Sequence, residues 1–127
     1  MPFSPDLIES PHRLRVRTDN KILVIASGIA VFNFQGTSAD PGGWRRDDIV
    51  ITAVDNLDFQ VERIVPTVSL ASISNLGTAV NAGWAVDDVR AEVSGSNVVL
   101  RSRLAVRDTD GIIHRVAFHV SVLSQRQ

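Results

Sequence analysis

The stretch VVLRSRLAVRDTDGIIHRVAFHVSVL, residues 98–123, decides the fold, because apolar and polar side chains alternate along both of its halves. The apolar side of the first half is Val98, Leu100, Leu104 and Val106, opposed by Arg101, Arg103 and Arg107. The apolar side of the second half is Val116, Phe118, Val120 and Val122. Between the halves, Asp108-Thr109-Asp110-Gly111 has turn chemistry, and Gly111 tolerates a positive φ. We therefore predict two strands joined as a hairpin.

Further strands are expected on both sides of this stretch. They cover Leu14 and Val16 with their neighbouring arginines, then residues 22–25, 29–34, 49–54, 59–65, 67–74 and 86–93. Pro66 cannot donate to a ladder, so it indicates a sheet edge, a bulge or a strand start. Residues 35–47, rich in glycine, and Asn75 to Gly83 are expected to be loops. No helical period is convincing, and the prediction is an all-β, antiparallel β-sandwich of about six to eight strands, with a barrel as the neighbouring possibility.

Residues 22–34 form the longest apolar run, which only Ser27, Gly28 and Asn33 interrupt. A continuous apolar run indicates a strand that is covered on both faces. Either a central strand or a contact between subunits would provide that cover. The run is too short to cross a bilayer as a helix, so we expect no membrane partner.

Composition restricts the domain organisation and the partners. The chain has 127 residues, no cysteine and a formal charge of −1, which fits one domain without disulfides and disfavours nucleic acid as a partner. Nearly all basic residues are arginines, which are favoured at interfaces. We expect a flexible N-terminal arm over residues 1–11 and a single sandwich domain over residues 12–127. The start lacks a signal-peptide pattern, so a soluble protein, cytoplasmic or released without a signal peptide, is expected.

Catalytic and metal-binding patterns are weak in this sequence. The segment from Asp108 to Gly111 resembles the start of a calcium loop, but the twelfth position is His119 instead of a glutamate. His114 shares the strand parity of Val116, which predicts a core or interface histidine, whereas His119 is expected to be exposed. We expect no metal and no cofactor. Paired carboxylates, for example Glu62 and Glu92, leave a small hydrolase open as an alternative.

Two tryptophans suggest a binding surface. Trp44 lies in a glycine-rich loop beside Arg45, and Trp84 follows Gly83 at the start of a strand. An indole ring beside hydrogen-bonding side chains suits a sugar ring. The alternative is that each tryptophan closes an end of the sandwich or an interface.

The order of elements from residue 42 onward resembles the H-type lectin domain. The similar features are Gly43-Trp44, Val65-Pro66-Thr67-Val68-Ser69-Leu70 with Ile73 and Leu76, Arg90 to Val93, the Ser94-Gly95-Ser96-Asn97 turn, and the terminal pair of strands. The resemblance covers about two thirds of the chain and implies a six-stranded antiparallel sandwich that assembles as a trimer. That family holds galactose-type sugars with an arginine after the middle loop and an aromatic residue at the tip of the final hairpin. These residues are not matched here, where the two neighbourhoods read Trp84-Ala85-Val86 and Arg107-Asp108-Thr109.

We therefore predict a non-catalytic binding or assembly module that forms a homo-oligomer, with a trimer expected and carbohydrate as the first ligand class. The ligand-binding residues are predicted to be Trp44, Arg45, Trp84, Arg107 and Asp108. The chief alternative is a structural component of a phage particle or another assembly, with no small-molecule ligand.

Overall fold

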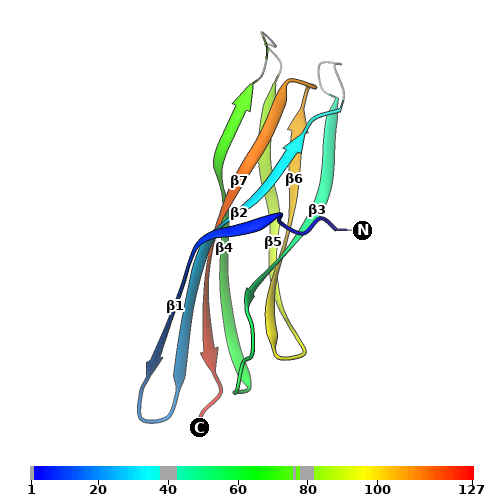
Figure 1. Cartoon of the computed structure of the whole chain (residues 1–127). Coiled ribbons are helices and arrows are strands. Elements are labelled where there is room, and N and C mark those ends of the chain that lie inside the picture. The colour runs from blue at the N-terminus through cyan, green and yellow to red at the C-terminus, as the bar shows by residue number, and fades with distance from the viewer. Residues whose placement is uncertain (1, 38–42, 76, 78–81) are drawn as a thin grey trace.

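The fold is a β-sandwich of seven strands in two antiparallel sheets (Figure 1). The computed structural model describes residues 2–37, 43–75, 77 and 82–127. The strands are β1 (Leu7–Arg17), β2 (Ile22–Gln35), β3 (Trp44–Val54), β4 (Val61–Asn75), β5 (Gly83–Ser94), β6 (Asn97–Arg107) and β7 (Gly111–Ser124). One sheet has the order β1-β2-β7-β4 and the other β3-β6-β5. No helix in the described part of the chain is long and apolar enough to cross a membrane.

The core lies between the sheets and follows the predicted alternation. The fully buried side chains include Val98, Leu100, Leu104 and Val106 from β6 and Val116, Val120 and Val122 from β7. On the inner face of β3, Ile49, Ile51 and Val54 belong to the same cluster. Apart from the register shifts near Val54 and near His114, every second side chain of these strands faces the opposite sheet, as a period of two requires.

The connection between β6 and β7 corrects the predicted hairpin. β6 pairs with β3 and β5, whereas β7 pairs with β2 and β4, so the two strands lie in different sheets. Their apolar sides face each other across the core, which two strands paired within one sheet cannot do. The positive φ in the turn belongs to Asp108, at 79°. Gly111 is required for space, because a Cβ there would lie 2.8 Å from Cγ1 of Val106.

Several predicted boundaries shift. Residues 22–25 and 29–34 merge into the single strand β2, and residues 59–65 and 67–74 merge into β4, which begins at Val61. β4 is an edge strand, which is where a proline such as Pro66 is tolerated. β3 begins at Trp44 and β5 at Gly83, inside segments predicted to be loops. The predicted loop positions Pro41, Gly42 and Asn81, and Leu76, lie outside the described residues.

The segment expected to be an N-terminal arm contains the start of a strand. Residues 7–11 belong to β1, which pairs with β2. Further upstream, Phe3 forms a parallel bridge with Ile49, through N–H of Phe3 donating to O of Asp48 and N–H of Val50 donating to O of Phe3. The segment therefore crosses from the edge of one sheet to the edge of the other (Figure 1).

β1 points its arginines toward the protein and its apolar side chains outward. Arg15 is the register partner of Val24, which is fully buried, whereas Leu14 is the partner of the outer-face Ile25. Arg13 and Arg15 make ion pairs with Asp55 and Asp58 on the β3–β4 connection. Charges that face inward on an edge strand discourage strand-to-strand aggregation, and here they leave apolar side chains facing solvent.

Gly36→Ala tests the close approach at the β6–β7 connection. A Cβ at Gly36 would lie only 2.0 Å from the carbonyl oxygen of Asp108, so the backbone must move. We expect the free energy of unfolding to fall by about 1–3 kcal/mol, as for overpacking of a core, measured by urea denaturation. Gly95→Asn is the control, because Gly95 has open space and a φ of 62° that asparagine tolerates. Equal stability of Gly36→Ala and the native chain would contradict this account.

Candidate functional site

Trp44 lies on the outer face of the β3-β6-β5 sheet, at the end where β6 connects to β7. Its register partner on β6 is Arg107, whose own partner on β5 is Gly83. The guanidinium carbon of Arg107 lies 5.1 Å from the indole centroid, and that of Arg46 lies 5.6 Å away. A Cβ at Gly83 would come within 2.9 Å of Cη2 of Trp44, so the ring rests on the glycine backbone. The half-buried indole is thus held between two arginines, at cation–π distance.

Trp84 points the opposite way. It is the register partner of the fully buried Val106 and packs against the core as a partly buried side chain. Its indole Nε1 is buried and has no hydrogen-bond partner among the described residues, which costs free energy that the packing of the ring must offset. Trp84 therefore closes the upper end of the sandwich, defined here as the end with the β6–β7 connection.

Arg45 and Asp108 make contacts within the fold near the upper end. The guanidinium carbon of Arg45 lies 4.2 Å from the ring centroid of Phe34, and its NH1 donates to the carbonyl oxygen of Gln35. Arg45 therefore fastens the start of β3 to the end of β2. Asp108 is buried in the β6–β7 turn, where its Oδ1 accepts from N–H of Asp110 at 3.4 Å. Among the described residues, no three His, Asp or Glu side chains come together as a metal site requires.

The five predicted site residues therefore separate. Trp44 and Arg107 meet on the outer face, joined by Arg46, while Trp84 and Arg45 point inward and Asp108 lies within a turn. The alternation of side chains along β5 and β6 already indicates that Trp84 faces inward and Arg107 outward. For Trp44, the alternation gives the direction only once the start of β3 is known.

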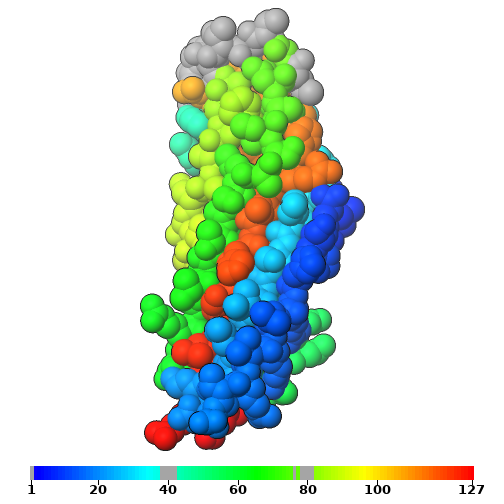
Figure 2. Space-filling model, turned by 90° about the vertical axis from the view of Figure 1, so that its left-hand side faces the viewer, coloured from blue at the N-terminus to red at the C-terminus, as the bar shows by residue number. Residues whose placement is uncertain are grey.

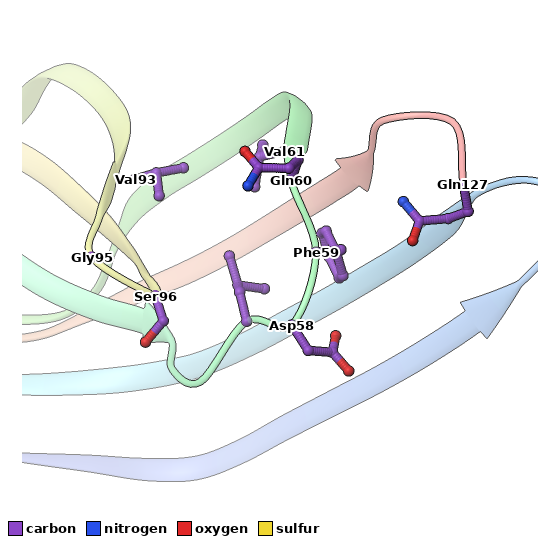
Figure 3. A pocket seen from close by; sticks show the side chains of 9 residues that line it. Asp58, Phe59, Gln60, Val61, Val93, Gly95, Ser96 and Gln127 are labelled. Atoms are coloured by element: carbon purple, nitrogen blue, oxygen red, sulfur yellow. The ribbon is translucent and has the colours of Figure 1, made fainter.

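An open hollow of about 650 Å³ lies at the lower end, where β3 connects to β4 and β5 turns into β6 (Figure 3). Phe59 and Val61 give it an apolar side, and Asp58, Ser96 and Gln127 add polar groups. Asp58 is the one described lining residue with a carboxylate side chain, so the lining does not supply the pair of Asp or Glu side chains that the hydrolase alternative requires.

Asp58 is held by β1. NH1 of Arg15 donates to Oδ1 of Asp58 at 2.8 Å, and the guanidinium carbon lies 5.8 Å from the ring centroid of Phe59. This hydrogen bond lowers the pKa of Asp58 below its ordinary value of 3.8. Because the folded-state pKa is depressed, the pair stabilises the fold above the unfolded pKa, and this contribution is lost as the pH falls through the folded pKa.

Figure 2 shows the outer face of the β1-β2-β7-β4 sheet, with its four strands side by side. Each of these strands contributes apolar side chains to that face. One cross-strand row is Leu14, Ile25, Ser121 and Val65, and the next is Val16, Leu23, Leu123 and Arg63. Leu14 is 57% exposed, Val65 48% and Val16 40%. We call the apolar members of the two rows the outer apolar face. Large apolar side chains gathered on one exposed face mark interaction sites more often than scattered ones do.

His114 is not on the core side where its parity with Val116 placed it. The pairing of β7 shifts register between Ile113 and Arg115, so Ile113 takes the buried position and His114 faces outward. There its ring nitrogens contact Oγ of Ser74 and Oδ1 of Asn33. His119 is exposed, as predicted.

Arg15→Ala tests the control of Asp58. We expect the pKa of the Asp58 carboxyl to rise toward 3.8, because the main group that favours its charged form is removed. The measurement is an NMR titration of the side-chain carboxyl carbon. Arg17→Ala is the matched control, and it should raise the pKa less, since Arg17 acts only through a weaker charge interaction. An unchanged pKa in Arg15→Ala would refute the assignment.

The chain was compared with known proteins by family and by structure. No protein-family model, no curated protein and no solved structure matches it. Function is therefore inferred from the geometry of the chain's own residues.

Proposed function

We propose that this domain is an assembly module that forms a homo-oligomer through the outer apolar face. The observation that supports this proposal is the orientation of β1, which directs Leu14 and Val16 into solvent while its arginines face the protein. An isolated domain gains nothing from exposing those side chains. A second sheet laid on this face would bury them, as stacked sheets do at a spacing of about 10 Å.

A second copy of this chain is the proposed occupant of the face. The two rows contain one charged residue, Arg63, at their edge, so the face offers little charge to select a partner of opposite sign. A nearly uncharged apolar surface can pack against the apolar surface of another copy without a specific charge pattern, and most soluble oligomers have closed symmetry. The trimer implied by the lectin resemblance is the stoichiometry that we propose for the assembly. A role as a component of a larger particle would use the same contact.

Val65→Asp tests the assembly. A carboxylate placed in the buried contact costs several kcal/mol to desolvate, so the dissociation constant should rise on the order of 100-fold or more. Native mass spectrometry at micromolar concentration should show oligomers for the native chain and monomers for Val65→Asp. Val93→Asp is the matched control, because Val93 is 47% exposed but lies on the other sheet, and it should leave the oligomer intact. A monomeric native chain at that concentration would refute the proposal.

Carbohydrate is the ligand class that we propose for the other sheet, at Trp44. The observation that favours it is the half-buried indole beside Arg46 and Arg107, since an apolar ring edged by hydrogen-bond donors suits a sugar. This surface lies on the opposite side of the sandwich from the outer apolar face, so a sugar and a neighbouring subunit would not compete for it.

Trp44→Ala tests sugar binding. On a glycan array, the native chain should bind sugars with an exposed apolar face, and Trp44→Ala should lose the signal. The matched control is Phe59→Ala, which removes an aromatic ring at the lower end. No binding by the native chain across diverse sugars would reject the carbohydrate and leave the purely structural role.

A further inference from the structure

Ser74, His114 and Asn33 form a hydrogen-bonded chain across three neighbouring strands. Oγ of Ser74 on β4 lies 2.7 Å from Nε2 of His114 on β7. Nδ1 of the same ring lies 3.0 Å from Oδ1 of Asn33 on β2. These are the two contacts that relate a nucleophile to its base and the base to the group that orients it.

Irregular pairing in the same region brings the three side chains together. Asn33 has a φ of 53° and lies where the β2–β7 register shifts between Val31 and Phe34. On the other side of β7, the β4–β7 register shifts on both sides of Ser72. Such bulges redirect side chains and are frequent beside active sites. Regular pairing would have kept His114 on the core side, away from Ser74 and Asn33.

The contact with Asn33 determines the protonation of the imidazole. A carbonyl oxygen only accepts hydrogen bonds, so Nδ1 of His114 carries the proton. In a neutral imidazole, Nε2 is then an acceptor, and the hydroxyl of Ser74 donates to it. In this tautomer, which the contact with Asn33 favours, His114 can accept the proton of Ser74.

We propose that Ser74 is a nucleophile for acyl groups, with His114 as its general base and Asn33 as the residue that positions the ring. The contact of Ser74 with His114 supplies a general base, and base catalysis alone suffices for an activated ester with a good leaving group, which is the substrate class that we propose. This activity goes beyond the assembly role. Ser74 lies nine positions after Val65 on β4, roughly 30 Å away at about 3.3 Å per residue.

The reaction is a balanced acyl transfer followed by hydrolysis. Oγ of Ser74 bonds to the acyl carbon while its proton moves to Nε2 of His114, and the bond from that carbon to the leaving oxygen breaks. The leaving group either takes the proton from His114 or departs as a phenolate while His114 gives that proton to solvent, so Nε2 is free again in both cases. Water then attacks the acyl-serine, gives a proton to Nε2 and releases the carboxylic acid, and Ser74 recovers its proton.

The test uses the full chain with 4-nitrophenyl acetate. Release of nitrophenolate is followed by absorbance, and the acetyl group is located by mass spectrometry of peptides. Ser74→Ala should abolish the reaction, and His114→Ala should slow it by about 100-fold or more. Ser69→Ala is the matched control, because Ser69 is an exposed serine on the same strand, and it should react like the native chain.

Asn33→Asp distinguishes positioning from a structural role. Aspartate also tolerates the left-handed backbone at this position, and its charge favours the protonated ring in the transition state. The rate should rise, and the midpoint of the pH–rate profile should move to higher pH. An acetyl group on His114, or a native rate in Ser74→Ala, would overturn the proposal, because the imidazole would then be the nucleophile.

The same experiment separates this activity from the assembly. Val65→Asp should retain the native rate of acetyl transfer, since the outer apolar face lies far along the strand from Ser74. An oligomer without acetyl transfer would overturn the Ser74 proposal alone.

Discussion

The contact between the inner side chains of β6 and β7 is the interaction on which the rest of the structure depends. Leu100, Leu104 and Val106 are fully buried from one sheet, and Val116 and Val120 from the other. Because the two strands follow each other in the chain, one short connection must carry the backbone from one sheet to the other. That connection leaves no space for a Cβ at Gly36 or Gly111. The core, the ends of the strands and the position of Trp84 all follow from this crossing.

The outer surfaces of the two sheets differ in chemistry, and the two functional proposals are based on this difference. On the β3-β6-β5 sheet, ion pairs such as Arg103 with Asp48 and Arg101 with Glu92 cover the face, and water satisfies such groups well. On the other sheet, Leu14 and Val65 meet water instead. Burying apolar area is the main driving force for association. Assembly is therefore proposed for the apolar face, and ligand recognition for the charged one.

The orientation of β1 explains how the apolar face persists at the sheet edge. Arg13 and Arg15 reach across the open side of the sandwich to Asp55 and Asp58. Exposed ion pairs of this kind each contribute little stability. Their effect is to hold the arginine side of the strand inward, so that Leu14 and Val16 lie on the opposite, outer side. Irregular pairing farther along the same sheet has the reverse effect, because it brings the polar side chains of Ser74 and His114 together.

The sequence by itself determined the all-β class, the inner rows of β6 and β7 and the turn at Gly95, because strand parity and turn chemistry are local properties. Only the tertiary structure decided that β6 and β7 lie in different sheets, since the same turn residues fit a hairpin or a crossing. It also decided that the arginines of β1 face inward, because their partners lie more than 40 positions away in the chain. Trp84 and Trp44 face opposite sides because of where β5 and β3 begin, and Ser74 meets His114 because of bulges in the sheet. Strand starts and bulges both depend on pairing between distant segments. The local alternation of side chains indicates which residues share a face of a strand. Pairing between distant segments determines whether that face contacts the core or solvent.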